Sequence, residues 1–297
     1  MPSPPAPPTV TTPSRREALA WLAGFAMAAA GTAAHAASDG ARGFDHGLLW
    51  RVERRGVAPS HLFGTLHLDD PRALDFRPPV RRAFAAARML VIEMLEDDTS
   101  ARRFVLASRL DGGETLRDIA GEEVAARVAA VLGSRYGMPP EVSLRLKPWA
   151  AYLALAQPSR PLGEIVDAAL RRMARQRALP VQALETLEEQ VQALEAVPEA
   201  SQVALLDAIA RRHDEAQAAI PALLERYLDG DLAGLLSLQY DAIDGEPALH
   251  APLDDLLEQL LRRRNERMAQ RGLHLQGAEG VPARLQRAGW RVRPVEA

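Results

Sequence analysis

The sequence predicts an α+β fold, with a mixed β-sheet, flanking helices and a large helical insert in the middle of the chain. Two observations lead to this prediction. Short apolar stretches that are typical of strands lie towards both ends of the chain, whereas the long region between them shows helical periodicity interrupted by glycine and proline. Hydrophobic residues make up 47% of the 297 residues, so the chain can bury a substantial core.

The first elements are a predicted hairpin. Residues 48–54 alternate between apolar and polar side chains, an Arg-Gly pair turns the chain, and residues 60–66 return as the second strand. A helix is expected over residues 80–87, close after two prolines, and residues 89–93 are predicted as a buried strand. Because strand, helix and strand follow one another here, we expect a parallel crossover.

The middle of the chain is predicted to be helical. Its helices are bounded by glycine or proline, and the clearest of them are expected over residues 101–109, 122–132, 147–156 and 165–177. The second of these is expected to end at Gly133. Further helices follow, and the last long one is expected over residues 256–269.

The remaining strands belong to the second half of the chain. Residues 181–184 are a predicted short strand that ends at Glu185, and Thr186 is expected to cap the next helix with Glu189 as its capping-box partner. A helix over residues 281–288 and a strand over residues 290–295 are expected at the end. With strands on both sides of a helical region, we expect one domain over residues 47–297.

Composition excludes several classes of site. The formal net charge is -3, which leaves no basic footprint for nucleic acid. The sequence contains no cysteine, so disulfides, thiolate nucleophiles and cysteine zinc sites are excluded.

Residues 1–36 are predicted to be a twin-arginine-type signal peptide. Arg15 and Arg16 form the arginine pair, residues 18–34 are an alanine-rich apolar run, and Ala34-His35-Ala36 supplies small residues for a signal peptidase. We expect export to the periplasm by the twin-arginine route, with an uncleaved N-terminal anchor as the alternative. No later apolar run is long enough to predict a membrane span after signal removal. Residues 37–46 are a predicted polar linker.

His67 and Glu93 are the first candidates for a functional site. His67 follows the strand over residues 60–66, and Glu93 ends the buried strand over residues 89–93. An imidazole and a carboxylate at the ends of apolar strands suit a metal site or acid–base chemistry. The alternative is a capped turn and a strand-end glutamate with no further role.

With these residues in view, residues 47–297 resemble the TraB/GumN family, which includes the Tiki metalloproteases. The motifs that carry the resemblance are spread along this whole region. In chain order they are Trp50, Gly64-Thr65-Leu66-His67-Leu68, Glu93, Lys147-Pro148-Trp149, Gly163 to Asp167, Leu184-Glu185-Thr186-Leu187-Glu188-Glu189-Gln190, Arg264-Asn265, Leu273-His274-Leu275 with Gly277, and Gly289-Trp290-Arg291-Val292.

The resemblance implies metal-dependent hydrolysis of a peptide or protein substrate, as in the Tiki branch. It implies a divalent metal ion, with manganese or cobalt suggested, held by His67, Glu93 and His274. A divalent ion lowers the pKa of bound water and polarises a carbonyl, while a carboxylate takes the proton. Glu185 would act as the base or hold a metal ligand in place, and Arg264 would stabilise a developing oxyanion or hold a carboxylate.

Glu185 and Arg264 have simpler alternatives. Glu185 precedes a helix and is favoured there by the helix dipole. Arg264 lies in an arginine-rich helix and is compatible with a surface salt bridge. The other histidines that lie outside any motif are expected to be surface or core residues; they are His46, His61, His213 and His250.

The sequence departs from the family before His274. In the family, a hydrophobic strand separates the Arg-Asn helix from the second histidine motif, and that motif begins with glycine. Here the helical pattern runs through Ala269, and Arg271 occupies the first glycine position. A strand takes about five to six residues, so we expect His274 to be displaced and the metal site to be weakened.

Two other functions therefore remain open. One is a non-catalytic periplasmic module that binds a metal, haem or peptide. The other is an accessory protein for envelope polysaccharide or conjugation. Neither of them needs two histidines and a glutamate to converge, whereas a peptidase of this kind does.

Overall fold

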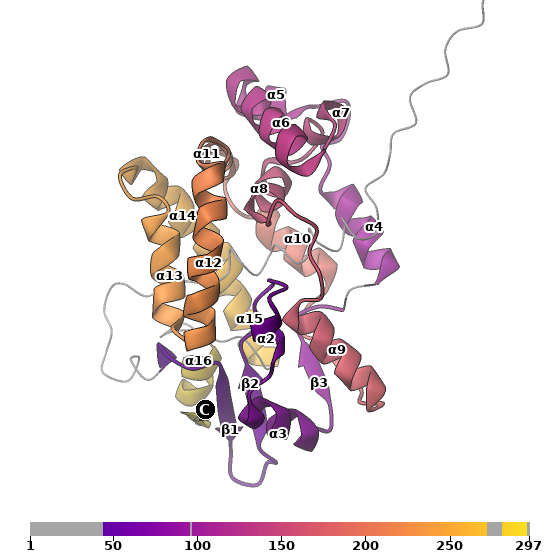
Figure 1. Cartoon of the computed structure of the whole chain (residues 1–297), viewed down its shortest axis with the longest axis vertical. Helices are drawn as coiled ribbons and strands as arrows, with labels where there is room; N and C mark the ends of the chain where they lie inside the picture. The colour runs from indigo at the N-terminus through magenta and orange to yellow at the C-terminus, as the bar shows by residue number, and fades with distance from the viewer. Residues whose placement is uncertain (1–43, 96, 272–280, 296–297) are drawn as a thin grey trace, which may run out of the picture.

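The structure is a computed structural model that describes residues 44–95, 97–271 and 281–295. It confirms the predicted α+β class: short strands gather at one end of the molecule, and the helices of the middle of the chain extend away from them (Figure 1). Residues 1–43, which carry the predicted signal peptide and most of the linker, lie outside the described residues. Within the described ranges, no helix is long and apolar enough to cross a membrane.

The hairpin at the start of the domain forms as predicted. Strands β1 (Leu49–Glu53) and β2 (Ser60–Phe63) pair antiparallel, and β5 (Arg291–Pro294) adds to the other edge of β1, giving the order β2-β1-β5. Trp50 lies opposite Leu62, and both side chains are almost completely buried. The ladder continues one residue past β2, because the N–H of Gly64 donates to the carbonyl of Leu48 at 2.8 Å. This pairing leads the chain directly towards His67.

The parallel pairing forms between different strands from those expected. Strand β3 (Leu90–Ile92) pairs in parallel with β4 (Val181–Ala183), so its hydrogen-bonded partner comes from after the helical insert. No crossover ladder between β2 and β3 is present in the described residues, and their strands divide into two small sheets. The prediction failed because strand order along the chain does not determine which backbone edges meet. The parallel register does bring the carboxyl ends of β3 and β4 together.

A hydrophobic cluster surrounds the strands. It contains Trp50, Leu62 and Val292 from the antiparallel sheet, with side chains from the helices that pack around it. These helices are α2 (Pro71–Leu74), α3 (Pro78–Ala86), α9 (Val166–Gln176), α12 (His213–Asp229), α13 (Leu232–Asp241) and α16 (Val281–Arg287).

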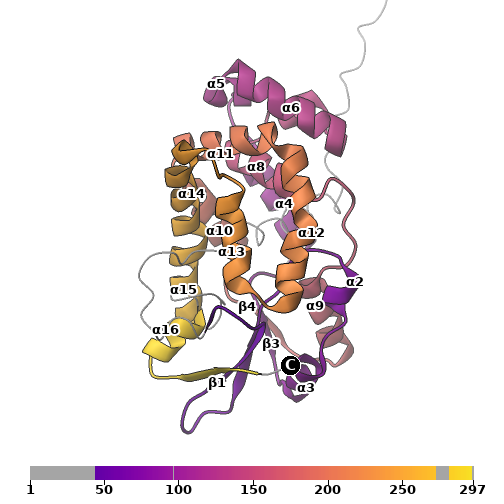
Figure 2. The same cartoon turned by 60° about the vertical axis from the view of Figure 1, so that its left-hand side comes forward.

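The helical insert is built around a second hydrophobic cluster. Figures 1 and 2 both place α5 and α6 at the opposite end of the molecule from the strands. The elements of this part are α4 (Asp98–Ala107), α5 (Leu116–Ala120), α6 (Glu122–Tyr136), α7 (Pro140–Ser143), α8 (Pro148–Ala156), α10 (Leu187–Glu195), α11 (Glu199–Arg211), η3 (Pro247–Leu249), α14 (His250–Leu257) and the π-helical η4 (Glu258–Arg263). Helix α15 (Arg264–Arg271) follows η4, and its Ala269 packs against the cluster around the strands.

One predicted helix end was wrong. Helix α6 continues through Gly133 to Tyr136, and Gly137 ends it in the left-handed conformation with φ of 66°. An interior glycine lowers helix stability by only about 1 kcal/mol relative to alanine. The buried face formed by Ala125, Val128 and Leu132 outweighs that penalty.

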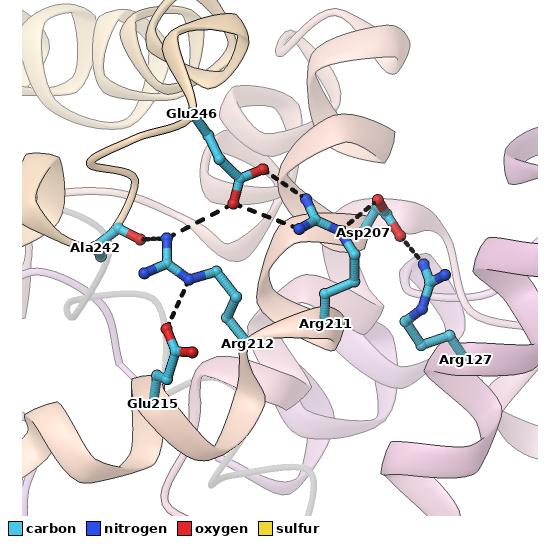
Figure 3. Close-up of polar contacts among 7 residues, drawn as sticks. All are labelled: Arg127, Asp207, Arg211, Arg212, Glu215, Ala242 and Glu246. Atoms are coloured by element: carbon cyan, nitrogen blue, oxygen red, sulfur yellow. Dashed lines mark hydrogen bonds and ion pairs between the residues drawn. The ribbon is translucent and has the colours of Figure 1, made fainter.

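A chain of ion pairs ties the insert to α12. Glu246 accepts from Arg211 at 2.8 Å and lies 3.7 Å from Arg212, while Arg211 also donates to Asp207 at 3.0 Å (Figure 3). Asp207 in turn pairs with Arg127 of α6. Partly exposed pairs of this kind contribute about 0–1 kcal/mol each. They link α6, α11 and the start of α12 to the segment before η3.

Candidate functional site

His67 is a buried histidine held against a carboxylate. It lies just beyond β2 and is 9% exposed. Its Nε2 lies 3.2 Å from Oδ2 of Asp167, which belongs to the first turn of α9. A carboxylate at this distance attracts the imidazole when the ring is protonated. Metal-binding histidines commonly have such a partner on the nitrogen that does not meet the metal.

Asp167 is itself positioned by one further contact. The hydroxyl of Thr65 donates to its Oδ1 at 3.2 Å, so the first histidine motif supplies both partners of this carboxylate. Nearby, the hydroxyl of Tyr227 donates to the carbonyl of Gly64 at 2.9 Å. Burial, with a smaller contribution from the charge of Asp167, raises the pKa of Tyr227 above its usual value, so this hydroxyl remains a proton donor.

The loop before α9 is tied to the first motif through Asp69. Arg160 donates to both oxygens of Asp69, at 2.7 and 2.6 Å, and the N–H of Gly163 donates to Oδ2 at 2.7 Å. A Cβ on Gly163 would lie 3.1 Å from that oxygen, so a side chain there would crowd the contact. The Arg160 guanidinium, helped by the Gly163 N–H, holds the pKa of Asp69 below its usual range. These contacts place Asp167 next to His67.

Glu93, Glu185 and Arg264 form a second cluster, at the carboxyl ends of β3 and β4. The N–H of Glu185 donates to the carbonyl of Glu93 at 2.9 Å, so the two residues are neighbours across the backbone pairing. Arg264 lies between them: Nη2 is 3.2 Å from Oε2 of Glu93, and Nε is 3.2 Å from Oε2 of Glu185. Its Nη2 also contacts Oε1 of Glu185.

The charges of this cluster are strongly coupled because they are buried. Arg264 is fully buried, and the side chain of Glu185 is 3% exposed, whereas that of Glu93 is 29% exposed. Burial alone would lower the pKa of Arg264, but the charges of Glu185 and Glu93 outweigh it and raise the pKa above its usual value. Arg264 therefore stays charged and neutralises one of the two carboxylates.

Gln190 and Thr186 hold Glu185 in place. The amide Nε2 of Gln190 donates to Oε1 of Glu185 at 2.7 Å, and both side chains are buried. Thr186 caps α10, and the predicted capping box with Glu189 is present. The cap fixes the start of the helix, and with it the direction in which Glu185 and Gln190 face each other.

Arg264 reaches the cluster from an unusual helix. The π-helical segment η4 leads directly into Arg264, and Nη1 of this residue lies 3.4 Å from the carbonyl of Leu260. Single π-helical turns are rare and frequently occur at functional sites. The alternative of a surface salt bridge is wrong for Arg264, since its side chain is completely buried.

The described donors do not complete a metal site. His67 and Glu93 have the chemistry of metal ligands; His67 contacts Asp167, and Glu93 contacts Arg264. In the described part of the chain, no group of three or more His, Asp or Glu side chains lies close enough together to hold a metal ion. His274, the third predicted ligand, lies outside the described residues. The helix before it runs to Arg271, in agreement with the helical pattern in the sequence.

Sequence reasoning did not assign a role to several residues that the structure brings to the site. Asp167 and Gln190 lie within the family motifs, yet only the fold shows that one contacts His67 and the other contacts Glu185. Thr65 likewise lies within a motif without an assigned role, and Tyr227 was not singled out. The motif from Gly163 to Asp167 was the available signal for Asp167, because it marks the start of a helix. The fold places that helix start beside the first motif.

Comparison with known proteins gives two matches. A sequence model described as the TraB/PrgY/gumN family matches residues 48–271. The protein named Metalloprotease TIKI1 from Danio rerio is 29% identical over 113 residues, which cover 37% of this chain and 19% of that protein. The matched part is thus a minor share of the relative's length. No solved structure matches the chain.

Proposed function

Because the chain belongs to the TraB/PrgY/gumN family, and part of it is similar to a metalloprotease, we propose that it is a metal-dependent peptidase with a weakened metal site. The observation that carries the proposal is the contact between His67 and Asp167. It gives the histidine of the first motif the carboxylate partner that metal-binding histidines have. The metal would be a divalent ion, with manganese or cobalt suggested by the family.

The residues of the second cluster, Glu93, Glu185 and Arg264, would take part in hydrolysis of the substrate. Glu185 has its carboxylate in a buried setting at a strand end, where it can take a proton from a reacting water. Arg264 holds Glu185 and Glu93 in fixed positions through its guanidinium, which agrees with its predicted role of holding a carboxylate. Gln190 orients Glu185 from the other side.

We further propose that this activity is exported to the periplasm. The support is the arginine pair at Arg15 and Arg16 and the small residues of Ala34-His35-Ala36. The substrate would be a peptide or protein of that compartment.

Metal titration of the purified protein tests the proposed function. Manganese or cobalt uptake should be weak in the wild type and lost in His67→Ala and Glu93→Ala, with the fold retained because both residues follow strands rather than lie within them. His274→Ala should change uptake little. His250→Ala, at an exposed histidine of α14, is the matched control. Hydrolysis of an unfolded protein substrate should rise with added metal.

Two outcomes would contradict parts of this proposal. Tight stoichiometric metal binding that disappears in His274→Ala would show that the metal site is complete. Equal metal content in the wild type, His67→Ala and Glu93→Ala would exclude these two residues as ligands.

A non-catalytic binding or accessory protein is the second candidate. The observation that favours it is the engagement of both Glu93 and Glu185 by Arg264, which reduces the negative charge offered to a cation. In that case peptides would bind without being cleaved at any metal concentration.

A further inference from the structure

Strand β4 has an open edge. It pairs with β3 along one side, and no strand of the described residues pairs with its other side. Gln182 and Ala183 are both exposed, although neighbouring residues of a strand point to opposite faces. The outer edge of β4 is therefore accessible from both faces.

The parallel ladder shows which backbone groups face this open edge. The N–H of Leu90 donates to the carbonyl of Pro180, and the N–H of Leu184 donates to the carbonyl of Ile92, both at 2.9 Å. In a parallel ladder, alternate residues bond to the same neighbour. Gln182 therefore directs its backbone groups to β3, whereas Val181 and Ala183 direct theirs to the open edge.

A pocket of about 260 Å³ lies at the carboxyl end of the same strand. Its walls include Ala183 and Glu185, Leu95 after β3, Thr99 in the first turn of α4, and Leu187 at the start of α10. This volume lies just below the range of about 300–1,000 Å³ for pockets that hold drug-sized ligands. It is suited to a single amino-acid side chain.

We propose that an extended peptide pairs with the outer edge of β4 and places one of its side chains in this pocket, beside Glu185. The inference rests on the proposed function, since it identifies the form in which a peptide substrate approaches the site. An open strand edge is a template for a further strand, and many peptide-binding domains use this mode.

The composition of the edge supports this use. Native proteins protect open edges with very short strands, charged side chains, proline or bulges. The residues of β4 are Val181, Gln182 and Ala183, which carry no charge. The strand is only three residues long, so backbone pairing alone gives modest affinity, and the pocket supplies the remaining contact.

The charges of the pocket indicate which side chain fits. The walls carry the carboxylates of Asp97, Glu185 and Glu188 and the guanidinium of Arg103. Arg103 itself pairs with Glu188 at 3.0 Å. Glu185 is likewise paired with Arg264, so the negative charge of Asp97 remains, and it disfavours an acidic side chain of the peptide and favours a neutral or basic one.

Peptide binding in the presence of a chelator tests the inference without requiring catalysis. The probe is a short fluorescein-labelled peptide of alternating threonine and valine with a lysine at each end, and binding is followed by fluorescence anisotropy. Ala183→Pro removes the outward N–H but no ladder hydrogen bond, and should weaken binding by about tenfold or more, as expected for a lost backbone hydrogen bond and its neighbour. Gln182→Ala, which leaves the edge backbone intact, should bind as the wild type does.

Backbone methylation of the probe gives a second arm that needs no protein variant, so it holds even where Ala183→Pro fails to fold. Alternate N–H groups of a strand point to the same edge, so one peptide is methylated on one alternate set and a second peptide on both sets. The first can still pair through its unmethylated edge and should retain binding to the wild-type protein, whereas the second should lose it. Equal binding of both, or no binding of the parent peptide, would overturn the proposal.

The inference and the proposed function fail in different ways. Binding with the expected methylation pattern, but no hydrolysis when metal is added, would support peptide pairing with β4 and contradict the proposed peptidase activity. Metal-dependent hydrolysis with the same KM in the wild type and Ala183→Pro would support the proposed peptidase activity and overturn the proposed peptide pairing with β4.

Discussion

Nε2 of His67 lies 3.2 Å from Oδ2 of Asp167, so a carboxylate from α9 orients the histidine of the first motif. Asp167 is also bonded to Thr65 in the same motif, and this makes the motif and the start of α9 one unit.

The first prediction concerns this carboxylate. Asp167→Asn keeps the shape of the side chain but removes its charge, so the imidazole of His67 loses the attraction of a carboxylate. We expect the affinity of the protein for manganese to fall by about 10- to 100-fold, as for other partners of metal-binding histidines. Isothermal titration calorimetry measures the affinity.

Asp254→Asn is the matched control for Asp167→Asn. Asp254 lies in α14 and accepts from the hydroxyl of Tyr240 at 3.0 Å, so it is a bonded carboxylate outside the site. Unchanged manganese affinity in Asp167→Asn would show that His67 does not depend on Asp167 for metal binding.

The second prediction concerns export. Replacing Arg15 and Arg16 together with lysine should leave precursor in the cytoplasm, because the twin-arginine route reads the arginine pair itself rather than its charge. Cell fractionation followed by immunoblotting measures the distribution. The same double change at Arg54 and Arg55, an exposed pair after β1, is the control. Normal periplasmic processing of the signal variant would exclude the twin-arginine route.

The sequence predicted the parts of the site that depend on local structure. Glu93 and Glu185 were expected at strand ends because each follows an apolar run, and the structure places them there. The capping box of Thr186 and Glu189 was also confirmed, since its pattern spans only four residues. Periodicity and turn residues are sufficient for features of this kind.

The features that depend on tertiary structure could not be predicted from local pattern. The pairing of β3 with β4 joins segments on either side of the helical insert. Arg264 lies among several arginines in the sequence, and only the fold shows that it is a buried one. The contact of Asp167 with His67 likewise needs the loop contacts of Asp69 with Arg160 and Gly163.

The third prediction concerns His213, a buried histidine at the start of α12. It is 3% exposed, and its Nε2 lies 2.9 Å from the hydroxyl of Tyr136. Burial lowers the pKa of His213 below 6.5, against the opposing charge of Asp214 at 3.6 Å, while Arg135 lowers it further. The folded protein thus takes up this proton at lower pH than the unfolded chain does.

The sign of the pH dependence follows from this shift. The contribution of neutral His213 is fully present above the unfolded pKa of about 6.5 and is lost as the pH falls through the lower folded pKa. We expect the free energy of unfolding to fall between about pH 7 and pH 5, and His213→Gln to reduce that fall in urea denaturation. His250→Gln, at an exposed histidine, should leave it unchanged. Identical pH dependence in the wild type and His213→Gln would exclude His213 as a source of the fall in the free energy of unfolding.

The last prediction concerns the buried charges around Arg264. Arg264→Met removes the only cation shown in contact with Glu185, whose side chain is 3% exposed, among the residues that the structure describes. An uncompensated buried charge lowers the free energy of unfolding by about 3–5 kcal/mol. Urea denaturation measures this loss. Arg263→Met removes an exposed arginine that pairs with Glu258, and should lower stability by less than about 1 kcal/mol.

A double variant separates the charge of Arg264 from its packing. In Arg264→Met with Glu185→Gln, the carboxylate that needed the guanidinium is gone, and the amide at position 185 can still bond to Gln190. We therefore expect the double variant to be more stable than Arg264→Met alone, with a coupling energy within the range of about 0.5–3 kcal/mol for contacting residues. If the two single losses simply add, Glu185 does not depend on Arg264, and the cluster is not an electrostatic unit.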